Sequence, residues 1–202
     1  MIARWIDRVI AYDGSQLRAH WILQCTGIAG DALVAFRGPC RVADAEMADL
    51  EDLGGPGIAG DDMVHFLWES FDDAALTEAI WRQRLLTCIA AESLLATGAG
   101  HASTGGRGPD QPTARPVVVR DGDDLFVGSG KLSISIATRS PVSTLIHLAV
   151  NVSPSGAPVP VASLAELGVE PEAFAREVLD RTAREVESVR RARAKVRAKG
   201  EA

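Results

Sequence analysis

The chain has 202 residues, of which 47% are hydrophobic and 24% are charged, and its formal net charge is −6. This length and composition are typical of one folded domain with a full-sized core, and they exclude a largely disordered chain. Residues 1–8 contain scattered charges rather than the apolar core of a signal peptide, and no apolar stretch approaches the ~18 residues of a membrane helix. Three cysteines without metal-type spacing indicate free thiols, so we expect a cytoplasmic protein.

The N-terminal part alternates apolar segments with turns. Residues 1–12 predict a strand that ends at the turn 13–16, where Asp and Gly occupy favoured positions. Residues 17–28 are apolar but poorly periodic, and they fit a short helix or a strand. Residues 32–36 read Ala-Leu-Val-Ala-Phe between glycine-containing turns, which predicts a buried strand.

A long polar region separates this strand from the next. Residues 37–62 are acidic and rich in glycine, with one short helix expected at 43–53, and a loop region of this length is typically functional or disordered. A strand is expected at 63–68. Apolar residues at helical spacing then predict a long helix over 72–97, followed by a flexible connection over 98–114.

The C-terminal part predicts strands followed by helices. The continuously apolar run Leu-Ile-His-Leu-Ala-Val is typical of a strand that is buried on both faces. Strands are expected at 116–119, at 125–127 leading into 131–137, and at 144–152. Helices are expected at 164–168 and 170–198. This order predicts an α+β fold, in which a mixed or antiparallel sheet packs with a long central helix and a C-terminal helix.

We expect a single domain over 1–189 and a basic C-terminal tail over 190–202. No aromatic residues are interleaved with the basic residues of the tail, so a solvated C-terminal segment is favoured over a nucleic-acid-binding one. We therefore expect the chain to bind a small-molecule substrate and to bind neither nucleic acid nor a membrane. The sequence is also compatible with a homodimer.

Lysine is rare in this chain. Of 21 basic residues only three are lysines, and Lys131 is the sole one in the first 194 residues. Residues two apart on a strand share a face, which would place Lys131, Ser133 and Ser135 together and turn Leu132, Ile134 and Ile136 to the core. Beside Asp124, this row could line a pocket in which the lysine ammonium neutralises a carboxylate or a phosphate. A solvated strand face with an exposed lysine is the alternative.

The segment around Lys131 resembles the hallmark of biotin and lipoate protein ligases. These enzymes carry Lys-Trp-Pro-Asn-Asp-Leu, a short turn, Lys-x-x-Gly, and later a strand that ends in Asn-Val. Arg120 matches the first lysine, Asp124 the aspartate, Lys131 the catalytic lysine and Asn151 the asparagine of the last pair. The chain more closely resembles an uncharacterised family, domain of unknown function 366, through Tyr-Asp-Gly-Ser-Gln-Leu at 12–17, His65-Phe66 with Glu69, and Lys-Leu-Ser-Ile-Ser-Ile-Ala from Lys131.

The resemblance implies the ligase-type fold and a set of site residues. Lys131 and Asp124 would be catalytic, and ATP with Mg²⁺ would be the cofactors if the ligase chemistry is retained. The residues implied in substrate binding are Ser15, Gln16, Arg37, Arg120, Asp123, Ser133 and Asn151. The chain departs from the ligases at Asp123, which replaces an asparagine, and at Ile134, which replaces the glycine of Lys-x-x-Gly.

We therefore expect a small-molecule enzyme that activates or transfers a carboxylate, as an adenylate-forming ligase or an acyltransferase, and not biotin or lipoate ligation itself. The alternative is a non-catalytic ligand-binding or interaction protein on the same fold, and the resemblance to the uncharacterised family implies a link to 7-deazapurine metabolism. Two weaker hypotheses remain. The first is a metal site at His65 and Glu69, which share a face but lack the further ligands that a metal ion needs. The second is an acyl-carrying cysteine, either Cys25 or Cys40, whereas Cys88 is expected in the helix core.

Overall fold

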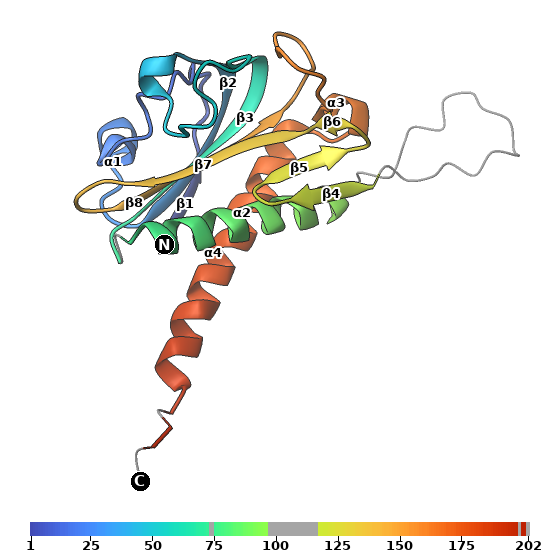
Figure 1. The fold of residues 1–202 in the computed structure, drawn as a ribbon. Coiled ribbons are helices and arrows are strands. Elements are labelled where there is room, and N and C mark those ends of the chain that lie inside the picture. The colour runs from blue at the N-terminus through green and yellow to red at the C-terminus, as the bar shows by residue number, and fades with distance from the viewer. Residues whose placement is uncertain (73–74, 97–116, 198, 201–202) are drawn as a thin grey trace, which may run out of the picture.

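The structure is a computed structural model that describes residues 1–72, 75–96, 117–197 and 199–200. It contains two sheets and two long helices (Figure 1). The elements are β1 (Ile2–Trp5), α1 (Trp21–Thr26), β2 (Ala32–Val42), the 3₁₀ turn η1 (Asp44–Glu46), β3 (Ile58–Ser70), α2 (Leu76–Ala96), β4 (Val118–Asp121), β5 (Asp124–Val127), β6 (Gly130–Lys131), β7 (Ser133–Arg139), β8 (Thr144–Asn151), α3 (Leu164–Leu167) and α4 (Pro171–Lys195).

The main sheet has five strands in the order β1-β2-β3-β8-β7. β1 runs parallel to β2, and every other pair in this sheet is antiparallel. β3 and β8 are central, and their inner residues are buried on both faces because each strand has a packed layer on either side. The predicted mixed α+β architecture is confirmed.

One face of the main sheet packs against α2 and α4, which also contact each other (Figure 1). Leu33 and Ala35 of β2 point into this layer, together with Phe174 and Val178 of α4. α4 begins at Pro171, where the fixed φ of proline suits the first helical position, and the Glu170 side chain accepts hydrogen bonds from the first turn. The larger hydrophobic core therefore lies between the sheet and the two long helices.

The opposite face of the main sheet carries a smaller core and a cavity. Val34 and Phe36, which alternate with the residues of the first layer, pack here against Tyr12 and against Ile22 of α1. The segment from Val42 to Ile58 covers part of this face.

The second sheet is a small antiparallel meander, β4-β5-β6, beside α2 (Figure 1). Leu125 of β5 and Leu132, which follows β6, are fully buried in the larger core. This burial fixes the meander against the body of the protein and directs Lys131, next to Leu132, to the other side.

Several predicted boundaries were wrong. The N-terminal strand ends at Trp5 and does not reach residue 12, because Tyr12 makes only an isolated bridge to Cys40. β2 and β3 extend well into the region expected to be a loop, so the connection between them spans only 43–57, and the helix expected at 43–53 is a single 3₁₀ turn. The connection expected at 98–114 lies outside the described residues.

The helices in the described part of the chain include none that is long and apolar enough to cross a membrane. The buried residues of α4 end at Thr182, and its later turns extend away from the sheets (Figure 1). Arg190, at the start of the expected tail, is still helical and pairs with Asp31 and Asp72.

Candidate functional site

A cavity of about 350 Å³ opens on the face of the main sheet that α2 and α4 do not cover. Its walls come from the connection 42–59, from β7 and β8, from the β5–β6 hairpin and from the segment 157–161. Cavities of this size accommodate small molecules and cofactors. Lys131, Asp124, Asp123 and Asn151 all line it, so these four predicted site residues are brought together.

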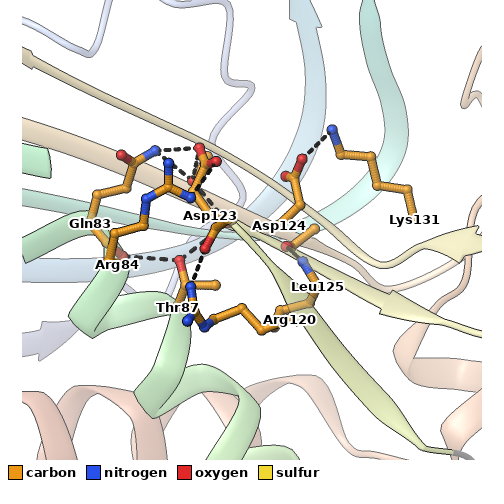
Figure 2. Close-up of polar contacts among 11 residues, drawn as sticks. Gln83, Arg84, Thr87, Arg120, Asp123, Asp124, Leu125 and Lys131 are labelled. Atoms are coloured by element: carbon orange, nitrogen blue, oxygen red, sulfur yellow. Dashed lines mark hydrogen bonds and ion pairs between the residues drawn. The ribbon is translucent and has the colours of Figure 1, made fainter. Parts of the chain in front are cut away.

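Lys131 and Asp124 form an ion pair on the cavity wall. Nζ of Lys131 lies 2.7 Å from Oδ2 of Asp124, and the two side chains are 35% and 23% exposed (Figure 2). Burial raises the pKa of the Asp124 carboxyl, the Lys131 ammonium partly offsets this shift, and the negative charges of Asp123 and Asp52 add to it. The ammonium has three donors, of which Asp124 occupies one, so Lys131 can still bind an anionic ligand group.

Backbone contacts hold Lys131 in place. The side-chain amide of Asn151 donates hydrogen bonds to the carbonyls of Lys131 at 3.1 Å and of Ala162 at 3.2 Å. The backbone N–H of Ala162 donates to the same Lys131 carbonyl at 3.1 Å. Asn151 therefore positions the lysine through its backbone rather than through its side chain.

Asp123 joins the β4–β5 turn to α2. Its carboxylate accepts hydrogen bonds from Gln83 at 2.6 Å, from Arg84 at 2.9 Å and from Ser135 at 3.0 Å (Figure 2). Thr87 of α2 donates to the backbone carbonyl of Asp123 as well. Because these donors engage its carboxylate oxygens, Asp123 mainly links the β4–β5 turn to α2 and β7, although it also borders the cavity.

A stack of aromatic rings forms another part of the cavity wall. Nδ1 of His65 lies 3.0 Å from Nε2 of His147, and Nε2 of His65 lies 3.1 Å from the Gly38 carbonyl oxygen. The Tyr12 ring stacks on His147 with centroids 3.8 Å apart and planes inclined by 12°. Tyr12 and His147 line the cavity, whereas His65 is completely buried behind them.

The Gly38 carbonyl determines the tautomers of this pair. A carbonyl oxygen can only accept, so the proton of His65 is on Nε2, and its Nδ1 accepts a hydrogen bond. His147 must then donate through Nε2–H. Burial lowers the pKa of His65 to about 4 and the pKa of His147 well below its usual value, with His65 adding to the second shift. Both rings are neutral at pH 7, and Nδ1 of His147 is an unprotonated acceptor.

Other predicted site residues lie away from the cavity wall. Ser15 and Gln16 are engaged in the turn, where Ser15 donates to Asp13 and Gln16 donates to the Ala11 carbonyl. Arg37 forms an ion pair with Asp62, with atoms 2.5 Å apart. The guanidinium of Arg120 donates a hydrogen bond to the Gly122 carbonyl.

The predicted common face of Lys131, Ser133 and Ser135 was wrong for Ser133, whereas Lys131 and Ser135 both line the cavity. The strand is interrupted at Leu132, which enters the larger core, and the alternation restarts in β7. Ser133 is consequently fully buried and accepts a hydrogen bond from the Leu125 N–H at 2.9 Å. Ile134 and Ile136, which the alternation assigned to the core, line the cavity.

The described residues contain no group of three or more His, Cys, Asp or Glu side chains arranged to hold a metal ion. His65 bonds His147, whereas Glu69 accepts hydrogen bonds from the His20 N–H and the Ser143 hydroxyl, so these two residues have separate partners.

The cysteines are not on the cavity wall. Cys40 is buried, and burial raises the pKa of its thiol to about 12, which disfavours the thiolate needed for acyl transfer. Cys25 accepts a hydrogen bond from Arg8 at 3.0 Å, and Cys88 is half-buried on α2.

Sequence reasoning missed Tyr12 and His147. The available signal was the presence of His65 and His147 in strands predicted to be buried on both faces, since a buried imidazole requires hydrogen-bonding partners. Which partners they would find depends on strand register, because His65 and His147 are diagonal neighbours on β3 and β8.

The cavity wall is strongly acidic. One lysine, Lys131, faces five carboxylates, namely Glu46, Asp49, Asp52, Asp123 and Asp124. A triphosphate needs several cations around it, and the only lysine here is already paired. The residues of the wall therefore do not by themselves fit ATP, and a nucleotide would require divalent cations between its phosphates and the carboxylates.

A family model described as "Domain of unknown function (DUF366)" matches residues 1–110 and 112–197. The Uncharacterized protein MJ0805 of Methanocaldococcus jannaschii is 31% identical over 187 residues, which cover 89% of this chain and 77% of that protein. The structure of a protein of unknown function from Pyrococcus horikoshi is 40% identical, covers 97% of both chains and has a TM-score of 0.85.

Ligases share this fold at low sequence identity. A putative lipoate protein ligase from T. acidophilum, Ta0514, has a TM-score of 0.58 at 15% identity over 93% of this chain and 86% of that chain. Biotin protein ligase from Aquifex aeolicus, in complex with biotin and ATP, has a TM-score of 0.57 at 13% identity over 90% of this chain and 71% of that chain. The predicted biotin/lipoate ligase-like fold is confirmed.

Proposed function

Since the chain belongs to the DUF366 family and has the fold of biotin and lipoate ligases, we propose that it is a small-molecule enzyme that activates or transfers a carboxylate. The observation that carries this proposal is the Lys131–Asp124 pair on the wall of a ligand-sized cavity. The substrate is neither biotin nor lipoate, because the chain departs from both ligases at Asp123 and Ile134.

Lys131 is the charge-stabilising group in this proposal. Carboxylate activation and acyl transfer both place negative charge on oxygen atoms in the transition state. A cation that is fixed beforehand stabilises such charge without reorganisation, and the backbone contacts from Asn151 and Ala162 provide this fixation. Asp124 orients the ammonium and, through its raised pKa, exchanges a proton more readily near neutral pH than an ordinary aspartate.

Two assays test the proposal. The first measures pyrophosphate release with ATP, Mg²⁺ and a panel of carboxylic acids, and the second measures thiol release from acyl thioesters in the presence of amines. We expect one of them to show turnover that Lys131→Met abolishes and that Lys195→Met, in the last turn of α4, leaves unchanged. Absence of Lys131-dependent turnover in both assays would contradict the enzymatic proposal.

A second candidate function is a non-catalytic ligand-binding protein on the same fold, with 7-deazapurine compounds among its ligands. The acidic wall favours this candidate, since it lacks the cations that a nucleotide-dependent ligase uses. Binding of a ligand that protects the fold without any turnover would support it.

A further inference from the structure

Two polar atoms on the cavity wall have no hydrogen-bonding partner among the described residues, although their side chains are almost completely buried. They are the Tyr12 hydroxyl and Nδ1 of His147, on residues that are 3% and 2% exposed. Neither atom belongs to the fully enclosed atoms that lack a partner, so both are accessible from the cavity, where a ligand can supply the partner.

The character of the missing partner follows from the tautomers. Nδ1 of His147 is an acceptor because His65 and the Gly38 carbonyl hold the proton on the other nitrogen. The Tyr12 hydroxyl keeps its proton because burial, helped by the charges of Asp13 and Glu46, raises its pKa, so this group can both donate and accept a hydrogen bond. A ligand group must therefore donate a hydrogen bond to Nδ1 of His147, and an N–H group can donate to the Tyr12 oxygen as well.

The neighbouring carboxylates add a preference for positive charge. Glu46, Asp49 and Asp52 lie on the 43–57 connection and line the same cavity, and none of them has an ion-pair partner among the described residues. Gly14 permits this arrangement, since its φ is +97° and a Cβ atom there would lie 2.7 Å from Cβ of Glu46. The turn after Tyr12 is thus packed directly against Glu46.

We propose that the Tyr12–His147 end of the cavity binds a cationic nitrogen group of the ligand, such as an amidine, a protonated amine or an aminated heterocycle. The N–H groups donate to Nδ1 of His147 and to the Tyr12 oxygen, while Glu46 and its acidic neighbours neutralise the charge. The same carboxylates disfavour benzoate-like and phosphate-like anions at this end.

This inference rests on the proposed function for the rest of the substrate. His147 and Asn151 are four positions apart on β8, which corresponds to roughly 13 Å along the strand. Asn151 holds the backbone of Lys131. A substrate that reaches both ends would carry its cationic nitrogen group at the Tyr12–His147 end and its carboxylate at the Lys131 end.

Equilibrium binding of two size-matched probes, benzamidine and benzoate, tests the inference by calorimetry without ATP. We expect benzamidine to bind more tightly than benzoate. Tyr12→Phe, which keeps the ring stack, should weaken benzamidine binding about twofold to tenfold through loss of one hydrogen-bonding oxygen. Glu46→Gln should weaken it about twofold to fivefold, whereas Glu51→Gln on the same connection, outside the cavity wall, should leave it unchanged.

His147→Asn provides a further variant, because asparagine retains an acceptor at the δ position. It should bind benzamidine better than His147→Phe, provided that both variants unfold cooperatively. Tighter binding of benzoate than of benzamidine, or equal benzamidine binding by the wild type, Tyr12→Phe and Glu46→Gln, would overturn the inference. Turnover dependent on Lys131 is measured separately, so failure of the enzymatic proposal and failure of this inference are distinguishable.

Discussion

The ammonium of Lys131 and the carboxylate of Asp124 meet across the β5–β6 hairpin at 2.7 Å, where Asp124 begins β5 and Lys131 ends β6. Both side chains border the cavity while Leu125 and Leu132, their neighbours in sequence, enter the core. The pair therefore combines a rigid hydrophobic support with access for a ligand, which is the arrangement that preorganised charge stabilisation requires.

Lys131→Met should separate function from stability. The partial exposure of both members of the ion pair limits its contribution to the free energy of unfolding to about 1 kcal/mol or less. Loss of the fixed cation should lower the turnover rate by about 100-fold or more. Lys131→Arg should not restore the rate, because a planar guanidinium occupies a different space from an ammonium. Urea unfolding and the two turnover assays measure these effects, and an active Lys131→Met variant would exclude a role in chemistry.

Asp123→Ala should destabilise the fold. It removes the acceptor for Gln83 and Arg84, and Gln83 is only 4% exposed, so its amide loses a hydrogen bond in a buried setting. We expect the free energy of unfolding to fall by about 1–3 kcal/mol in urea titrations. Asp121→Ala, at an exposed position of the same hairpin, is the matched control and should change it by less than about 0.5 kcal/mol.

Stability should decrease between pH 6.5 and pH 4.5. The pKa of His65 is lowered to about 4 and that of His147 is lowered too, so the unfolded chain binds more protons than the folded chain in this window. The contribution of the two neutral histidines to the free energy of unfolding is fully present above the unfolded pKa of about 6.5. Below that pH the free energy of unfolding falls by ~1.4 kcal/mol per pH unit for each histidine. Asp124, whose pKa is raised, acts in the opposite direction, since its folded carboxyl binds a proton more readily than the unfolded one.

Urea titrations at several pH values measure this slope. His65→Gln should reduce it. His20→Asn is the matched control, because His20 is exposed and lies outside the stack, and asparagine tolerates its left-handed backbone, with φ at 65°. A free energy of unfolding that is independent of pH in this window would show that the two imidazoles are not buried as neutral rings.

Gly38→Ala should be strongly destabilising. An added Cβ atom would lie 2.0 Å from the carbonyl oxygen of Ile10, so the segment before Tyr12 would have to move. The Gly38 carbonyl also accepts the hydrogen bond of His65. We expect a loss of about 3 kcal/mol or more in thermal or urea unfolding. Gly55→Ala, whose new atom would meet a carbonyl at 3.1 Å on the 43–57 connection, should cost much less.

Local patterns in the sequence predicted part of the site. Lys131 and Asp124 occupy adjacent short strands, so a hairpin brings them together whatever the rest of the chain does. The apolar runs predicted the central strands β3 and β8 because strands buried on both faces are continuously hydrophobic. The resemblance to the ligases predicted the fold, which the solved structures confirm.

Other expectations depended on contacts between distant segments. Arg37 was expected near the substrate, but Asp62 on β3 binds it away from the cavity wall. Ser133 was expected beside Lys131, but burial of Leu132 interrupts the alternation. Strand alternation alone cannot place such residues, because a single interruption exchanges the two faces.

The sequence by itself determined the α+β order of elements, the rarity of lysine and the local pairing of Lys131 with Asp124. Only the tertiary structure decided that Tyr12, His65 and His147 form one stack, with His65 and His147 separated by 82 positions in the chain. The physical reason is register: the pairing of β3 with β8 sets which buried rings meet, and the Gly38 carbonyl then sets which nitrogen of each ring carries a proton.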